Sequence, residues 1–414
     1  MNQQSLSQNY SRVVNLLIFI FPIVIISMQV AGDIVLFVLA MMGIYIAISR
    51  RLSPFAIKEI EVFSYLTFGY FIAICLSVVF SGQVAELAHY IPRDFYFLFA
   101  PFIALSLYKA DINLNYLLNG LKITLLLLGV ISYIGHVEGV YRPSGVINPA
   151  IYANIAVSMF IIVFIFLPYS SLKNKIFSIL SLLSGLIVIV AAGTRGAWLT
   201  LIFLFVVYLF FLYKQKTRSS RVVLISVALM ILGIFLYGSM NEHVKYRLSV
   251  AYDQITYYHS SESKVYNPIT ARLTMYEAAI DNIEDVPFFG HGLRTSNITL
   301  FKNNTKPLST ILARFNHLHN GFLTSYYNGG IVSLSALLLL LFLPLRIFMQ
   351  ANSQNRENPI FIAGALIPLG FLGHGMFNIL LGDTYMNGSY IFFLALFLLL
   401  TNKSNKTRNF RVLS

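Results

Sequence analysis

The sequence has little charge. Charged residues make up 11% of its 414 residues, against about 25% in an average soluble protein. Hydrophobic residues reach 57%, and the mean hydropathy is +0.73. This shortage of polar surface excludes an arrangement of two or three soluble domains. The apolar runs are continuous rather than alternating, which argues against a membrane β-barrel and predicts a helical membrane protein.

Cysteine, acidic residues and nucleotide motifs are also scarce. Cys75 is the only cysteine, so an internal disulfide is excluded. Lys and Arg number 29 against 16 Asp and Glu, a balance that in a membrane protein indicates basic cytoplasmic loops rather than a nucleic-acid partner. The sequence contains no Walker loop, Rossmann glycine pattern, H-E-x-x-H or G-x-S-x-G motif. We therefore expect no nucleotide and no cofactor.

Twelve apolar runs predict an all-α, polytopic membrane protein with about twelve transmembrane helices. The runs lie at residues 13–30, 34–49, 62–80, 94–108, 114–135, 150–168, 176–192, 197–213, 221–238, 322–345, 359–380 and 389–401. This divides the chain into nine spans over 1–238, a large loop over 239–320, three spans over 321–401 and a cytoplasmic tail over 402–414.

The distribution of Lys and Arg gives the orientation. With the N-terminus in the cytoplasm, the short outer segments hold only Arg93, Arg142 and Arg195. The inner segments hold Arg12, Arg50, Arg51, Lys58, Lys109, Lys122, Lys173, Lys175, Lys214, Lys216, Arg218, Arg221, Arg346, Arg356, Lys403, Lys406, Arg408 and Arg411. Basic residues favour the cytoplasmic side of a membrane. Both termini are therefore expected in the cytoplasm, with the 239–320 loop outside.

The 239–320 loop is too long and too polar for an idle connection. Within it, residues from Thr270 to Ile283 have helical periodicity, and Pro287 with Gly290 ends the segment. The predicted apolar stripe consists of Leu273, Tyr276, Ala279, Ile280 and Ile283. This pattern predicts an amphipathic helix on the outer membrane surface.

Two arginines at the outer side are candidates for binding an anion. Arg195 lies between Gly193 and Gly196, where a ligand could approach the backbone closely. Arg272 opens the loop helix and shares a face with Tyr276. A guanidinium group forms paired hydrogen bonds with phosphate. The alternatives are an interfacial arginine beside a belt tryptophan and a solvated helix charge.

Two histidines and a turn complete the candidate site. His317 and His319 precede Asn320 just before the tenth span, and histidine can accept a proton near neutral pH. Plain interfacial histidines are the alternative, and a metal site lacks nearby cysteine or carboxylate ligands. Arg142 lies in a Pro- and Gly-containing turn, which either lines a site or serves only as a turn.

Taken together, these segments resemble the O-antigen ligase family, within the superfamily of O-antigen ligases and polymerases. The matching strings are G-T-R-G at 193–196, A-R-L-T-M-Y-E at 271–277, P-F-F-G-H-G at 287–292 and H-L-H-N at 317–320. The resemblance covers the twelve-span plan, and residues 140–330 in motif detail.

The resemblance implies a GT-C-type glycosyltransferase of the bacterial inner membrane, acting at the periplasmic face without metal or nucleotide. Its substrates would be an O-antigen glycan on undecaprenyl diphosphate and the lipid A–core acceptor, both reached through the membrane lipids. Arg195 and Arg272 are then expected to hold the diphosphate, with His319 as the base. Expected substrate contacts are Arg142, Tyr276, His317 and Asn320.

Three other functions stay open. An O-antigen polymerase and a protein O-oligosaccharyltransferase share the superfamily and differ in the acceptor. A secondary transporter is the alternative of a different class, because transporters use broken helices near the bilayer midplane. The eleventh span is interrupted by Gly364, Pro368, Gly370, Gly373, His374 and Gly375.

Overall fold

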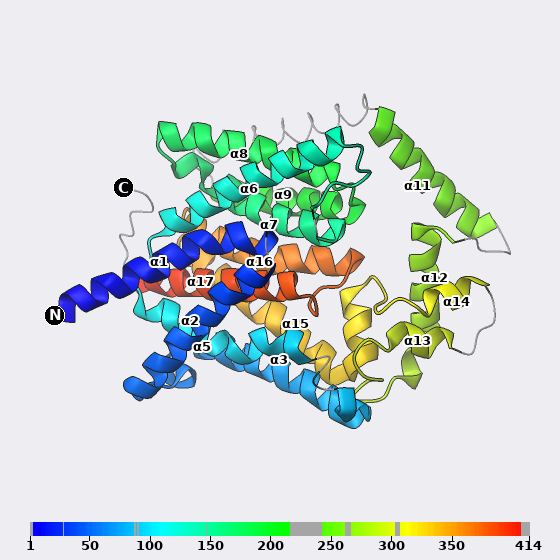
Figure 1. Ribbon diagram of the computed structural model, residues 1–414, viewed down its shortest axis with the longest axis horizontal. Coiled ribbons are helices and arrows are strands. Elements are labelled where there is room, and N and C mark those ends of the chain that lie inside the picture. The colour runs from blue at the N-terminus through cyan, green and yellow to red at the C-terminus, as the bar shows by residue number, and fades with distance from the viewer. Residues whose placement is uncertain are drawn as a thin grey trace.

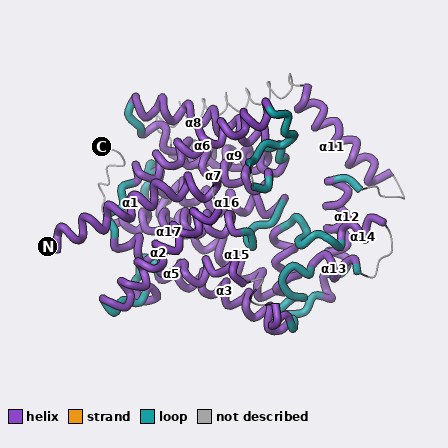
Figure 2. The backbone as a smooth tube through the Cα atoms, viewed as in Figure 1, coloured by secondary structure: helices purple, strands orange, loops and turns teal. Residues whose placement is uncertain are grey.

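The computed structural model describes residues 3–27, 29–86, 88, 91–145, 147–215, 242–260, 266–302 and 307–406. Every regular element within these ranges is a helix, as the continuous apolar runs predicted. Figure 2 shows the helices with loop segments at the two ends of the bundle, the largest group lying between α15 and α12–α14.

Ten helices of the described residues are long and apolar enough to cross a membrane, so the chain is a multi-pass membrane protein. They are α1 (Gln3–Ser27), α2 (Gln29–Ser49), α3 (Glu61–Phe80), α6 (Leu114–Val137), α7 (Pro149–Phe166), α8 (Leu172–Ala191), α9 (Arg195–Gln215), α15 (Gly321–Gln354), α16 (Pro359–Phe377) and α17 (Thr384–Lys406).

Two of the twelve predicted spans are not among these ten helices. The run at 94–108 forms α5 (Phe95–Lys109), which has 15 residues and packs against α2, α3 and α17. At about 1.5 Å per residue, α5 is shorter than the hydrocarbon core of a bilayer. The run at 221–238 lies outside the described residues.

Helices α7, α16 and α17 form the centre of the bundle (Figure 1). Every residue of α7 from Ile151 to Phe166 is buried. The apolar windows of α16 and α17 are 78% and 89% buried, against 33% for α8 and 39% for α1. Helices that are apolar on all sides belong in the interior, whereas the outer helices keep apolar side chains exposed where lipid would lie.

Four loop helices project from one end of the bundle, at the right of Figure 1. They are α11 (Glu242–Ser260), α12 (Pro268–Asp281), α13 (Ser296–Phe301) and α14 (Pro307–Leu312). A small core of Ala271, Met275, Ala279, Phe301, Leu312, Leu318 and Tyr327 joins α12, α13 and α14 to α15.

This core corrects the prediction for the loop helix. The buried face of α12 consists of Thr270, Ala271, Met275 and Ala279, whereas Ile280 of the predicted stripe is 60% exposed. The helix ends at Asp281, and a separate 3-10 turn covers Ile283–Asp285. The face of α12 packs on protein because α13, α14 and α15 offer it an apolar surface, so a membrane-lying helix is the wrong prediction.

Helix α15 is broken at Gly330, whose φ is 63° and ψ is −163°. The break exposes backbone carbonyls that the 287–292 loop then uses. His291 N donates to Tyr327 O and Gly292 N to Asn328 O, both at 2.9 Å. A Cβ on Gly330 would lie 2.0 Å from the carbonyl oxygen of Phe288. The P-F-F-G-H-G string is therefore the segment that docks the loop into the broken helix.

Candidate active site

A cavity of about 650 Å³ lies at the end of the bundle where the loop helices project. Its wall is built from segments far apart in the sequence: residues 93–94, 141–151, 193–196, 268–272, 293–294, 316–329 and 377–383. Five of the seven predicted site residues line it: Arg142, Arg195, Arg272, His317 and His319. Folding thus gathers side chains that the sequence separates by up to 177 positions.

Arg195 is the first residue of α9 and follows a braced turn. Gly193 has a φ of 60°, a region that favours glycine. Arg142 Nε donates to Ala192 O at 2.8 Å, and its Nη2 donates to Thr194 Oγ1 at 2.7 Å. Arg142 therefore lines the cavity and also holds the turn from which Arg195 begins.

Arg272 lies in the second turn of α12. Asn267 caps this helix, its Oδ1 accepting from Ile269 N at 3.0 Å and Thr270 N at 2.9 Å, and Pro268 occupies the first turn. Burial lowers the pKa of Arg272, with Tyr276 opposing the shift. An arginine stays charged in proteins, so Arg272 presents a partly desolvated positive charge to the cavity.

The backbone of the histidine segment is held by buried polar side chains. Asn297, which is fully buried, donates from Nδ2 to His317 O at 2.7 Å and to Phe315 O at 3.1 Å. Leu318 N donates to Thr324 Oγ1 at 3.1 Å. A loop clamped in this way keeps its side chains in fixed directions, which a reaction site requires.

Tyr276 and Asn320 support the histidines and are absent from the cavity lining formed by the described residues. The hydroxyl of Tyr276 donates to His319 O at 2.9 Å. Asn320 Oδ1 caps α15 by accepting from Phe322 N at 3.0 Å and Leu323 N at 3.1 Å.

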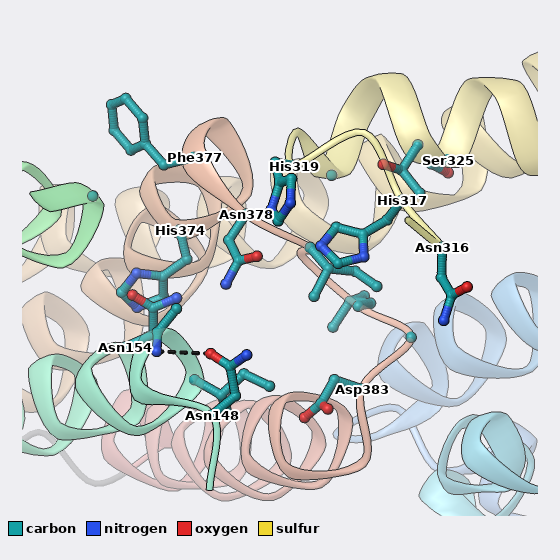
Figure 3. Close-up of a pocket in the computed structure, with 18 of the residues that line it drawn as sticks. Asn148, Asn154, Asn316, His317, His319, Ser325, His374, Phe377, Asn378 and Asp383 are labelled. Carbon is teal, nitrogen blue, oxygen red and sulfur yellow. Dashed lines mark hydrogen bonds between the residues drawn. The ribbon is translucent and has the colours of Figure 1, made fainter. Parts of the chain in front are cut away.

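The two imidazoles lie together, with ring centroids 4.4 Å apart and an angle of 66° between the planes. His319 has a φ of 52°, a left-handed conformation that is uncommon outside glycine. The side chain of Asn378, just past the end of α16, lies beside both histidines and favours their protonated forms. Figure 3 shows His317, His319 and Asn378 around one side of the cavity, with Asp383 across from them.

Burial lowers the pKa of both histidines. The pKa of His317 falls to about 4 through desolvation and the charge of Arg272, while the side chain of Asn378 opposes the shift. The pKa of His319 falls to about 3 through desolvation, His317 and Arg272, again opposed by Asn378. Both imidazoles are therefore neutral at pH 7 and able to accept a proton.

The structure adds site residues that the sequence patterns did not indicate. Arg93, Asp94, Arg294, His374, Asn378 and Asp383 line the cavity. Asp383 also caps α17, because its Oδ1 accepts from Tyr385 N at 3.0 Å. Burial raises the pKa of Asp383, while backbone hydrogen bonds and Arg93 oppose the shift. Arg294 lies within the 239–320 loop, and the only sequence signal of the other five is a polar side chain at or near the end of an apolar run.

The cavity is positively charged overall, since five arginines and two aspartates line it. Such a cavity concentrates anions. Within the described residues, no three His, Cys, Asp or Glu side chains are grouped so as to hold a metal ion. The arrangement can thus bind a phosphorylated ligand next to two neutral imidazoles.

Residues 179–338 match the family model described as O-Antigen ligase. The matched region spans 160 of the chain's 414 residues and is similar to that of the O-antigen ligase family. The segment matched to the O-antigen ligase family contains Arg195, Arg272 and both histidines, and it leaves Arg142 and Asn378 outside. An uncharacterized protein from Haemophilus influenzae is 26% identical over 213 residues, which are 49% of this chain and 52% of that protein. The chain thus spans about half the length of the curated relative it matches.

Proposed function

We propose that this protein transfers an O-antigen glycan from undecaprenyl diphosphate to a sugar of lipid A–core at the periplasmic face of the bacterial inner membrane. The observation that carries the proposal is that Arg195, Arg272, His317 and His319 line one cavity. That cavity opens at a single end of a multi-pass bundle. The match of residues 179–338 to the O-antigen ligase family supports the same reaction class.

Two guanidinium groups fit the diphosphate leaving group. The bond between sugar C1 and the phosphate oxygen breaks with its electron pair going to that oxygen, so the leaving group gains negative charge. Arg195 and Arg272 then stabilise the transition state more than the bound donor. Arg142 supports Arg195 through the turn that it braces.

His319 is the proposed base. The acceptor hydroxyl gives its proton to the neutral imidazole while its oxygen forms the new bond to C1, opposite the leaving diphosphate. One displacement of this kind inverts the anomeric carbon. The bound diphosphate raises the pKa of both histidines through its negative charge, which strengthens a base whose pKa is low in the empty cavity.

The orientation follows from charge. The ends of the spans that are rich in Lys and Arg are expected to face the cytoplasm. The cavity segments lie at the opposite ends of the spans, which are then the outer ends. Both termini are then cytoplasmic, and the loop that contains α11 to α14 is periplasmic. The undecaprenyl chain and lipid A reach the site by diffusing within the membrane.

The deciding experiment is the lipopolysaccharide pattern of a deletion strain. Complementation with wild type is expected to restore long glycan on lipid A–core, and Arg195→Ala, Arg272→Ala and His319→Ala are expected to leave bare core. Lipid-linked polymer should accumulate in each failing strain. Full-length O-antigen on lipid A–core in the Arg195→Ala or Arg272→Ala strain would disprove the diphosphate clamp.

The same strain separates the alternatives. A polymerase deletion leaves core bearing one repeat, and a protein O-oligosaccharyltransferase deletion leaves lipopolysaccharide unchanged and removes glycan from protein. Transfer between purified donor and acceptor in detergent excludes a transporter. That purified reaction is expected to proceed in a chelator, and a loss restored by divalent ions would contradict the metal-free reaction.

A further inference from the structure

The cavity reaches far into the bundle. Its inner part is lined by residues of the membrane-spanning helices: Tyr70, Ile74, Ile151, Asn154, Ser333, Leu337 and His374. Tyr70 lies ten residues before the end of α3, which corresponds to a depth of about 15 Å at the helical rise per residue. The inner part holds two ionisable side chains that the proposed reaction does not use, Tyr70 and His374, and His374 is the only imidazole among them.

His374 is buried and unpartnered. Its side chain is 1% exposed, lines the cavity, and has no hydrogen-bond partner on Nδ1 or Nε2 among the described residues. The backbone of Asn154 lies beside the ring and can bond at most one of its two nitrogens, and Figure 3 shows the two residues side by side. At least one ring nitrogen therefore remains for a ligand. Leaving a buried polar group unsatisfied is costly, and most such groups in proteins have a partner. This cost indicates that a ligand supplies the partner.

The packing of α9 against α16 fixes the depth of His374. The two helices run in opposite directions, since Gly196 lies against Phe377 and Gly373 lies against Thr200. His374 therefore lies about one helical turn, or about 5 Å, deeper than Arg195. Figure 3 shows the imidazoles of His317 and His319 on the other side of Asn378 from His374. The backbone N of Asn378 donates to His374 O at 3.0 Å.

The depth of His374 indicates which part of the donor it would contact. A lipid-linked donor must place its glycan toward the loops, its polyprenyl chain among the spans and its diphosphate between them. We infer that His374 donates a hydrogen bond to the phosphoryl group attached to the lipid, while Arg195 and Arg272 hold the phosphoryl group attached to the sugar. The inference rests on the proposed function, because it requires a polyprenyl diphosphate donor.

The two phosphoryl positions have different kinetic roles. Negative charge develops on the sugar-side phosphoryl group as the bond to C1 breaks, so Arg195 and Arg272 act mainly on kcat. The lipid-side phosphoryl group keeps its charge through the reaction. His374 thus binds ground state and transition state equally, and its loss raises the KM for the donor without lowering kcat.

The test uses the purified full chain and two lipids, undecaprenyl diphosphate and undecaprenyl monophosphate. Trp198, the only tryptophan, lies in the first turn of α9, and its fluorescence is the readout chosen for binding. In the monophosphate, the single phosphoryl group is the lipid-side one. His374→Leu is expected to raise the Kd of both lipids about tenfold to a hundredfold, the range for a hydrogen bond to a charged group. Arg195→Ala is expected to weaken the diphosphate alone.

Two further variants separate binding from folding. His374→Gln keeps a hydrogen-bond donor and is expected to bind both lipids within about threefold of wild type. His136→Leu, at an exposed position in the last turn of α6, is the matched control. His374→Leu removes an unsatisfied polar group and is expected to melt no lower than wild type without lipid. If the leucine variant does not fold, His374→Met takes its place.

The outcomes distinguish this inference from the proposed function. An unchanged Kd in folded His374→Leu overturns the inference, as does equal loss in the leucine and glutamine variants. A third outcome is that His374→Leu loses lipid binding while the wild-type protein transfers no glycan to lipid A–core. This outcome supports the role of His374 and overturns the ligase assignment. Wild-type protein that binds neither lipid overturns both.

Discussion

The hydroxyl of Tyr276 in α12 donates a 2.9 Å hydrogen bond to the backbone carbonyl of His319. This bond joins the loop helix to the histidine segment, 43 residues later in the chain. His319 has a φ of 52°, which carries a cost for any residue with a side chain. Tyr276 is therefore a positioning residue that helps to hold the proposed base in this conformation.

Removing the Tyr276 hydroxyl should slow transfer without weakening substrate binding. We expect Tyr276→Phe to lower kcat about tenfold with little change in KM, because a displaced base acts in the reaction step. Tyr326→Phe is the control, since that hydroxyl bonds the distant Ile283 O and is exposed. A raised KM at constant kcat would contradict the positioning role.

Lysine is not expected to substitute functionally for Arg195 or Arg272. Arg195→Lys and Arg272→Lys keep the charge and lose the planar fork that binds phosphate through two bonds. We expect each lysine variant to reduce kcat about a hundredfold, which is typical when one hydrogen-bond donor to the negative charge of the transition state is lost. Arg346→Lys at the opposite end of the bundle is the control, and kcat above half of wild type in both cavity variants would refute bidentate binding.

The pH dependence should reveal buried, neutral histidines. In the free enzyme, the pKa of His317 is about 4 and the pKa of His319 is about 3, both below the ordinary value of 6.5 for histidine. A base works only when unprotonated, so kcat/KM should stay constant from pH 8 to about 5 and fall below that. The kcat profile should fall at a higher pH, because bound diphosphate raises both pKa values. A kcat/KM midpoint near pH 6.5 would contradict the buried environment.

The docking of the 287–292 loop should depend on Gly330. An alanine there would adopt a φ of 63° and meet Phe288 O at 2.0 Å. We expect Gly330→Ala to destabilise the protein by at least about 2 kcal/mol, measured as melting in detergent. Gly69→Ala, where a Cβ meets nothing within 4 Å, should be neutral or slightly stabilising. Equal melting of the two variants would contradict the docking of the loop.

Two variants of Asn320 can distinguish a helix-capping role from a contact with the substrate. Asn320→Ala removes the cap of α15 and should cost about 1 kcal/mol, whereas Asn320→Ser keeps a cap. If Asn320 acts only as a cap, the serine variant should retain wild-type kcat/KM. A stable serine variant with strongly reduced kcat/KM would instead support the prediction from the motif that Asn320 contacts the substrate.

Much of the fold could be predicted from local sequence patterns. Long apolar runs indicate spans because backbone groups in lipid must bond within a helix, and ten of the twelve runs correspond to span-length helices. The face of α12 could not be predicted in the same way. Its buried residues depend on which apolar surfaces α13, α14 and α15 present to it.

The sequence by itself determined the membrane-protein class, the helices and the motifs that contain Arg195, Arg272 and the two histidines, because each of these is a short-range pattern. Only the tertiary structure brought them to one cavity and added Asn378 and His374 to it. It also showed Tyr276 and Asn320 holding the histidine segment by hydrogen bonds. Those relationships depend on contacts between helices distant in the chain, which no local pattern records.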